Sequence, residues 1–296
     1  MKLGFIGYGE AAFCITSGLL ENGVDGIIAF DKMQDTPGFC EKIRSRAAEA
    51  KVELMPSPAD VVSRCDVVIA AVQSSYAVEV CEMIKDSLRP GQIYADVSAS
   101  SPTIKETIWS LVQDTGVLFA DAAMMGLLPV RRHQVPITAS GNGAQAFADA
   151  VTPIGMNVKV IGERPGMASA IKLIRSIYMK GYDALLFEML RAAEAFDVFD
   201  EIIDNVGESM DGVPFRTLIE WMFPGLGVHA KRRSSEMKGT EAMLAEKNID
   251  FSMTHAIKAQ LDLIDEIDLN GLYKEGWPDS KDWKEVFHYV NTHAGQ

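Results

Sequence analysis

The first twelve residues carry the pattern that most restricts the fold of this chain. An apolar segment, residues 2–6, leads into the turn Gly7-Tyr-Gly9-Glu-Ala-Ala12, a G-x-G-x-x-A sequence that opens a predicted helix. The first glycine permits a tight turn, the second leaves room for a pyrophosphate, and the small alanine lets the helix pack against the strand. Phosphates then lie at the helix N-terminus, where free N–H groups favour negative charge. The pattern predicts a Rossmann domain that binds a dinucleotide.

A second apolar segment ends in an acidic residue at the distance expected of a ribose-binding carboxylate. Residues 26–30 lead into Asp31, which lies 24 residues after Gly7. A carboxylate accepts hydrogen bonds from an unmodified ribose and repels a 2′-phosphate, so NAD is the expected cofactor. Lys32 partly offsets that repulsion and leaves NADP as the alternative, and a simple strand-end turn is the other interpretation of Asp31. The predicted cofactor-binding residues are Gly7, Gly9, Glu10, Ala11, Ala12, Asp31, Lys32, Val72 and Gln73.

Charge and cysteine usage narrow the partners and the compartment. The net charge of −13 argues against binding to nucleic acid or to an anionic membrane surface, so an anionic substrate needs local cations. The four cysteines form no C-x-x-C pair, and the five histidines show no metal-ligand spacing, so we predict free thiols and no metal. No segment approaches the roughly 20 apolar residues of a membrane span. We expect a soluble cytoplasmic protein.

Short apolar segments alternate with amphipathic ones over the first half of the chain. This alternation predicts an α/β Rossmann domain with a mostly parallel sheet over residues 1–163. Long helical periods then predict an all-helical domain over residues 164–296, beginning with a helix from Met167 to about Phe196. Such a helix is expected to form an interdomain spine or part of a subunit interface. The predicted strands are residues 2–6, 27–30, 67–72, 93–97, 118–120 and 135–139.

Polar side chains recur along one side of this predicted long helix. Ser169, Lys172 and Ser176 lie three or four residues apart, and Lys180 and Asp183 continue the stripe. A polar stripe on a covered helix indicates a wet cleft, where desolvation brings the proton affinity of a lysine towards working pH. Lys172 is therefore a candidate base for alcohol oxidation, because the hydroxyl must lose its proton as the hydride leaves. On the helix pattern alone, a solvated surface lysine is the alternative.

Three further segments resemble, in order, the motifs of the β-hydroxyacid dehydrogenases, the family of 3-hydroxyisobutyrate and 6-phosphogluconate dehydrogenases. Residues 96–102 (DVSASSP) look like its D-x-S-T-x-x-P loop, residues 121–126 (DAAMMG) like its D-A-P-V-S-G segment, and residues 166–172 (GMASAIK) like the start of its catalytic helix. The resemblance extends over about residues 1–195. It implies Lys172 as general acid/base and Ser98 and Gly126 as substrate contacts.

Some positions depart from the family pattern. Ala99, Ala123, Met125 and Ser176 replace the family's Thr, Pro, Ser and Asn, although we keep Ser176 among the candidate substrate contacts. Much of the carboxylate-binding set is therefore missing, which argues against a simple 3-hydroxyisobutyrate-like substrate.

A cationic cluster in the second half offers a substitute for the missing anion contacts. Residues 231–237 (KRRSSEM) resemble a branch of phosphogluconate-dehydrogenase-like proteins with a distinct C-terminal domain. A guanidinium grips a carboxylate with two parallel hydrogen bonds, so Arg232 and Arg233 are candidate substrate-binding residues. The alternative is a solvated helix turn in which they pair with Glu236.

The motifs together predict an NAD(P)-dependent dehydrogenase for a small hydroxy acid or sugar acid, with Lys172 as general acid/base. Two alternatives stay open. One is a reductase of imines or opine-like adducts, because Met125 and Ser176 replace polar family groups. The other is a non-catalytic NAD-binding redox sensor. The resemblance also implies a homodimer with interlocking C-terminal helices.

Overall fold

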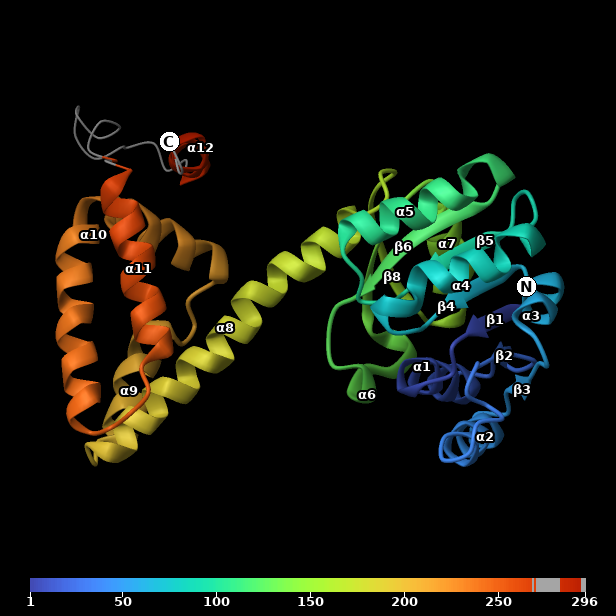
Figure 1. The fold of residues 1–296 in the computed structure, drawn as a ribbon, viewed down its shortest axis with the longest axis horizontal. Coiled ribbons are helices and arrows are strands. Elements are labelled where there is room, and N and C mark those ends of the chain that lie inside the picture. Colours follow the sequence, from blue (N-terminus) through green and yellow to red (C-terminus); the bar gives the residue numbers. More distant parts are fainter. Residues whose placement is uncertain (268, 270–282, 294–296) are drawn as a thin grey trace. The chain divides into compact units, whose positions relative to one another are not determined.

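A computed structural model describes residues 1–267, 269 and 283–293 of the chain (Figure 1). Two compact units, residues 1–177 and 178–296, meet within the long helix α8 (Met167–Ala195). The sequence predicts the start of this helix and places its end one residue later, at about Phe196. The domain boundary expected from composition, between residues 163 and 164, falls just before the helix begins.

The N-terminal unit is built on one eight-stranded sheet. Its strand order is β3-β2-β1-β4-β5-β6-β7-β8, and all neighbours are parallel except the antiparallel pair β6 and β7. This topology, followed by a helical region that begins with α8, confirms the predicted fold class. The strands are β1 (Leu3–Ile6), β2 (Ile28–Phe30), β3 (Glu53–Leu54), β4 (Val67–Ala70), β5 (Ile93–Asp96), β6 (Leu118–Met124), β7 (Pro136–Ser140) and β8 (Asn157–Gly162).

Helices cover both faces of the sheet because its central strands are apolar on both sides. Successive strand residues point to opposite faces, so Phe5 and Ile69 join one buried cluster while Ile6 and Val68 join the other. The first cluster includes side chains of α1 (Glu10–Glu21), α2 (Cys40–Glu49) and α7 (Ala144–Val151). The second includes side chains of α3 (Pro58–Arg64), α4 (Ala77–Ile84) and α5 (Pro102–Val112).

Three strands differ from the sequence prediction. The sequence did not predict the edge strands β3 and β8, because neither has the continuous apolar run of a buried strand. In β8, Val158 and Val160 alternate with polar neighbours. β6 continues to Met124, four residues past its predicted end, through a buried aspartate that is unusual inside a strand. That aspartate, Asp121, pairs with β5 on one side and β7 on the other, whereas the rest of β6 beyond it pairs only with β7.

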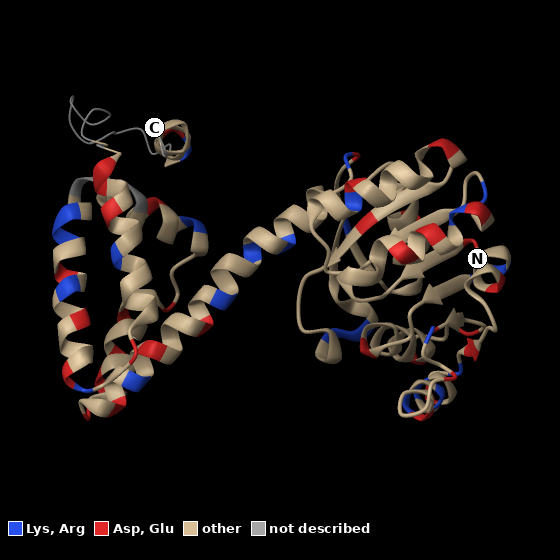
Figure 2. Cartoon of the chain, viewed as in Figure 1, with Lys and Arg blue, Asp and Glu red and all other residues tan. Residues whose placement is uncertain are grey.

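The C-terminal unit is helical. Within it, the carboxylate of Glu188 accepts hydrogen bonds from the backbone N–H groups of Met253 (2.8 Å) and Thr254 (2.8 Å) and so holds the first turn of α11 (Ser252–Glu266). Figure 2 shows acidic and basic residues along the helices of both units. The remaining helices are α6 (Leu128–Arg131), α9 (Phe199–Met210), α10 (Phe215–Glu246), α11 (Ser252–Glu266) and α12 (Trp283–His293).

Candidate functional site

The turn between β1 and α1 needs a glycine at position 7 for the fold itself, whether or not a ligand is bound. Gly7 has φ +88°, and its N–H donates to the carbonyl of Phe30 at 2.8 Å. A Cβ at this position would lie 2.5 Å from Val72 Cγ1 and 2.6 Å from the carbonyl oxygen of Ala71. Both the backbone conformation and the close approach of β4 therefore exclude a side chain.

Neither backbone conformation nor packing requires a glycine at the second position of the turn, Gly9. Gly9 has an extended backbone with φ −78°, and a Cβ there would meet nothing within 4 Å. Gly9 is the N-cap residue of α1, so no side chain at the N-cap position pairs with the first N–H groups of this helix. Ala12, in the first turn of α1, is fully buried. The open space beside uncapped N–H groups fits a bound phosphate. Glu10 is exposed and Ala11 is half-buried on the same first turn.

Asp31 is held against this turn by the backbone. Its Oδ2 accepts the N–H of Tyr8 at 2.7 Å, and its Oδ1 accepts the N–H of Met33 at 2.8 Å. Each carboxylate oxygen has a second lone pair, so the half-buried group keeps acceptor capacity for a ribose hydroxyl. Lys32 is exposed and pairs with Glu79 of α4, with Nζ 2.9 Å from Oε1.

The predicted cofactor residues converge on one edge of the sheet. They follow the carboxyl ends of β1, β2 and β4, and the strand order reverses direction between β1 and β4. Ligands of open α/β sheets bind at such a switch point. Val72 lies beside Gly7, as its short distance to a Cβ placed there indicates, and Gln73 is exposed just after it.

A buried ionic cluster occupies the neighbouring strand ends. Lys105 of α5 is 0% exposed, and its Nζ donates to the carbonyl of Asp96 (2.8 Å), to Asp96 Oδ1 (3.0 Å) and to Ser98 Oγ (3.4 Å). It also lies 3.6 Å from Asp121 Oδ1. The hydroxyl of Ser98, a predicted substrate contact, is buried and shares a 2.7 Å hydrogen bond with Ser100.

Sequence reasoning missed Lys105, although one signal was available. Lys105, Ile108 and Val112 share a helix face at spacings of three and four residues, so the lysine occupies a position that the apolar pattern assigns to the core. A charged residue at such a position requires buried partners, and the candidates are Asp96 in the predicted strand 93–97 and Asp121 just after the predicted strand 118–120.

The catalytic candidate lies one turn into α8. Lys172 is half-buried and follows by three residues the buried Ser169, whose hydroxyl donates to Asp121 at 2.7 Å. Ser176 donates its hydroxyl to the carbonyl of Lys172 at 3.0 Å, which is a local helix contact. Gly126 is exposed after β6 with φ +155°. The roles of these residues stay predictions.

The two candidate arginines belong to the C-terminal unit. Arg232 is exposed on α10 and forms an ion pair with Glu236, as the alternative interpretation of the cluster anticipates. Arg233 is half-buried, and its guanidinium folds back along the helix, with Nη2 3.4 Å from the position that a Cβ would take at Gly225.

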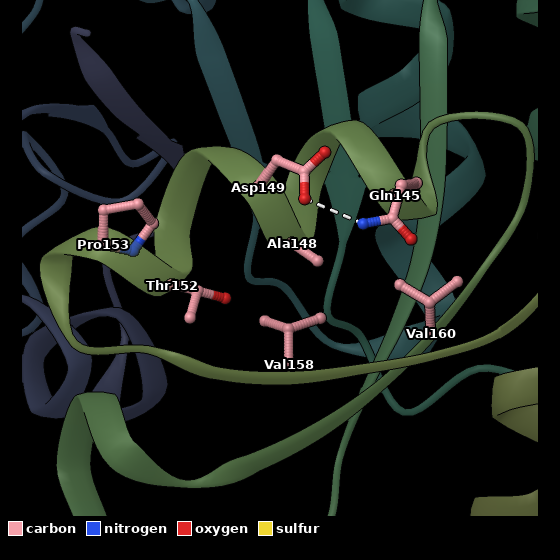
Figure 3. Close-up of a pocket in the computed structure, with 7 residues that line it drawn as sticks. All are labelled: Gln145, Ala148, Asp149, Thr152, Pro153, Val158 and Val160. Atoms are coloured by element: carbon pink, nitrogen blue, oxygen red, sulfur yellow. Dashed lines mark hydrogen bonds between the residues drawn. The ribbon is translucent and has the colours of Figure 1, made fainter.

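Two hollows lie away from the predicted residues. A hollow of about 520 Å³ opens between α7 and the edge strand β8, where Val158 and Val160 face Gln145 and Asp149, which hydrogen bond to each other (Figure 3). β8 is separated from β1 by four strands. In the C-terminal unit a mainly apolar cavity of about 360 Å³ is lined by residues of α8 to α11, Glu188 among them. Neither contains a predicted site residue.

The described residues add two general findings. All four cysteines are free thiols, with Cys65 and Cys81 buried and Cys14 and Cys40 half-buried. Burial raises the pKa of Cys65 to about 11 and that of Cys81 to about 12, so both are unreactive. None of the helices in the described ranges combines the length and apolar character that crossing a membrane requires.

Comparison with known proteins follows the two-part architecture. Residues 2–100 match the family described as NADP oxidoreductase, coenzyme F420-dependent, and residues 193–264 match a domain of unknown function, DUF1932. The conserved protein MTH1747, of unknown function and structurally similar to 3-hydroxyacid dehydrogenases, is 33% identical, covering 92% of this chain and 99% of that chain with a TM-score of 0.60.

Two further relatives extend the comparison. An uncharacterized 28.5 kDa protein of Methanothermus fervidus is 27% identical over 266 residues, which are 90% of this chain and 100% of that protein. An imine reductase from Myxococcus stipitatus in complex with NADP+ is 17% identical, covering 97% of this chain and 100% of that chain with a TM-score of 0.73. At this identity the likeness shows a shared fold.

Proposed function

We propose that this chain, which belongs to the family of 3-hydroxyacid-dehydrogenase-like NAD(P)-dependent oxidoreductases, oxidises a small hydroxy acid or sugar acid with NAD. The proposal rests on two features of the same chain: the open turn at Gly9, at the switch point of the sheet, and the half-buried Lys172 near the start of α8. The first fits a dinucleotide, and the second fits a proton acceptor.

The turn supports a dinucleotide and favours NAD. Gly9 leaves open space at the start of α1, which a pyrophosphate fits. Asp31 retains acceptor capacity for ribose hydroxyls and repels a 2′-phosphate, while Lys32, the nearest cation in sequence, is engaged by Glu79. A bound nicotinamide supplies the hydride acceptor that none of the amino-acid side chains can provide.

Lys172 carries the proton chemistry in this proposal. A neutral amine accepts the hydroxyl proton as the carbon is oxidised, and the resulting ammonium returns it in the reverse direction. The first turn of α8 is held by buried hydrogen bonds, so the backbone of the lysine is fixed while its side chain stays half-buried. Arg232 or Arg233 would bind the substrate anion in an otherwise acidic protein.

The proposal includes a homodimer in a reducing, cytoplasmic compartment. Ile174 is 66% exposed, Ile177 76% and Phe187 64%, and burial of these side chains of α8 against a second copy would be favourable. The free thiols suit a reducing compartment. Light scattering on the purified chain, with Ile177→Glu as a disrupting variant, tests the dimer.

The proposed activity is tested by following NADH formation with NAD and with NADP over a panel of hydroxy and sugar acids. Lys172→Ala is expected to lower turnover about 10²- to 10⁴-fold while NAD binding persists. Lys159→Ala, at an exposed lysine outside the polar stripe, serves as the matched control. Equal turnover by wild type and Lys172→Ala contradicts the assigned role.

Imine reduction is the second candidate. Met125 and Ser176 replace polar groups of the hydroxyacid pattern, and an imine reductase shares the fold. NADH or NADPH oxidation with cyclic imines, without activity on the hydroxy-acid panel, would favour this candidate. Tight NAD binding without turnover on either panel would favour the redox sensor.

A further inference from the structure

The buried cluster of Lys105, Asp96 and Asp121 is a costly arrangement for a protein interior. All three side chains are 0% exposed. Desolvating an ion is unfavourable even when it is paired, and apolar side chains of similar volume often serve stability as well or better. The cluster is therefore a candidate for a role beyond filling the core.

One side of the cluster fixes the chain that follows β5. The ammonium of Lys105 binds both the carbonyl and the carboxylate of Asp96, and Asp96 Oδ1 also accepts the N–H of Ser98 at 2.7 Å. Ser98 Oγ lies 3.4 Å from the same ammonium and bonds Ser100. The loop that resembles a substrate loop is thus tied to Lys105 through three separate contacts.

The other side of the cluster holds the start of α8. Asp121 accepts the N–H of Ser169 at 3.0 Å and its hydroxyl at 2.7 Å. Ser140 donates to Asp121 at 3.3 Å and accepts the N–H of Ala168 at 3.0 Å. These contacts satisfy N–H groups that a helix start leaves unpaired. Lys105 balances one of the two carboxylates, and the positive end of α8 favours the other.

The segment before α8 also packs closely on α5. A Cβ at Gly166, which has φ +87°, would lie 3.1 Å from the carbonyl oxygen of Pro102. Lys105 follows Pro102 by one helical turn, and Lys172 follows Ser169 by one helical turn, so each pair lies on one side of its helix. Two helix starts are therefore joined by direct packing and by the ionic cluster.

We propose that Lys105 is a positioning residue: through Asp121 it fixes the first turn of α8 and hence the placement of Lys172, and through Asp96 it fixes the Ser98 loop on the same frame. The inference rests on the proposed function, in which Lys172 contacts the substrate. Small displacements of a catalytic group lower the rate without weakening cofactor binding, because the glycine turn is a separate contact.

Two variants and two matched controls test the positioning role. Ser169→Ala removes only the hydroxyl contact with Asp121, and Lys105→Met removes the ammonium at similar length. Ser110→Ala and Lys159→Met are the corresponding changes at exposed positions of the same unit. The measurements are amide hydrogen exchange in peptides covering residues 166–176, the NAD dissociation constant, and kcat and KM for the hydroxy or sugar acid of the panel that wild type oxidises.

We expect Ser169→Ala to raise exchange across residues 166–176 about tenfold or more while exchange in β1 and α1 stays at the wild-type level. We expect kcat to fall about tenfold or more with the NAD dissociation constant within about twofold of wild type. Lys105→Met, which removes the cation itself, shows the same pattern more strongly. Ser169→Ala, which keeps the cation, tests the link from Asp121 to α8 where Lys105→Met does not fold. Uniform damage to the fold would instead raise exchange throughout the unit.

Wild-type exchange over residues 166–176 in folded Ser169→Ala, or wild-type kcat in the presence of raised exchange, overturns the positioning role. Failure of the proposed function gives a different result, namely equal turnover by wild type and Lys172→Ala or no turnover at all. Hydrogen exchange requires no substrate, so it then decides by itself whether the cluster anchors α8.

Discussion

The carboxyl edge of the sheet holds two regions built in opposite ways. Between β1 and β4 the chain presents bare backbone, with Gly9 in open space at an uncapped helix start. At β5 and β6 the same edge is filled by Lys105 and two aspartates that pair with it and with α8. The first region leaves donors for the charges of a ligand, whereas in the second a lysine of the chain lies between two of its own carboxylates. We call the Gly7–Gly9 turn the open region and the Lys105, Asp96 and Asp121 cluster the closed region.

The largest effect on stability is expected where the closed region loses its cation. Lys105→Met leaves Asp96 and Asp121 buried without their counter-ion, so the free energy of unfolding should fall by about 3–5 kcal/mol. Urea unfolding measures this change, and Lys159→Met, at an exposed lysine, should stay within about 0.5 kcal/mol of wild type. A loss of similar size in both variants would remove the distinction between the two regions.

The first glycine of the open region should also matter for stability. Gly7→Ala combines a positive φ with a Cβ 2.5 Å from Val72, so we expect a loss of about 2–4 kcal/mol in the free energy of unfolding. Thermal unfolding followed by circular dichroism without nucleotide provides the measurement. A wild-type melting temperature would mean that the β1–α1 turn adapts to a side chain.

The second glycine should show the reverse behaviour. Gly9→Ala places its Cβ in open space, so stability should stay within about 0.5 kcal/mol of wild type. NAD affinity should fall about tenfold or more, because the methyl group occupies space for the pyrophosphate. Calorimetric titration compares the two proteins, and unchanged affinity would show that the nucleotide binds elsewhere.

The smallest effect on stability is expected at His133. Its buried ring nitrogens have no hydrogen-bond partner among the described residues, whereas the buried ammonium of Lys105 donates three hydrogen bonds. A Cβ at Gly18 of α1 would lie 2.3 Å from Nδ1 of His133. Burial lowers the pKa of His133 below 6.5; Glu21 opposes this shift and Arg132 adds to it.

The unfolded chain therefore binds a proton at His133 more readily than the folded chain. The stabilising contribution of the neutral ring is present above about pH 6.5 and is lost as the pH falls through the folded pKa. We expect the melting temperature of wild type to fall more steeply between about pH 7 and about pH 5 than that of His133→Phe. Parallel curves for the two proteins would mean that protonation of His133 is not coupled to folding.

Much of the N-terminal unit follows from local sequence. The apolar runs at β1 and β4 and the glycine turn between β1 and α1 are short-range patterns, and they predict the Rossmann core. The start of α8 at Met167 is marked by the change from short apolar segments to helical periods. These features depend on residues close together in the chain, so a sequence without a structure is sufficient to find them.

The closed region was not predicted, because its contacts depend on pairing between distant segments. Asp121 reaches Lys105 and Ser169 only once β5, β6 and α8 have their observed neighbours. The helix pattern marks Lys105 as a core position, but it does not say which distant carboxylates pair with it. Edge strand β8 was missed for a related reason, since half-buried strands carry a weaker apolar signal than covered ones.

Asp121 is the residue of β6 that pairs with β5 and with β7 at once, and this double role bears on how the chain avoids misfolding. Strand side chains alternate between faces, so a slip of one residue in β6 would turn the carboxylate of Asp121 to the opposite face, while Lys105 would keep its contacts with Asp96. A misregistered sheet would then bury the carboxylate of Asp121 without a cation, so the cluster favours the native register of β6 over a shifted one.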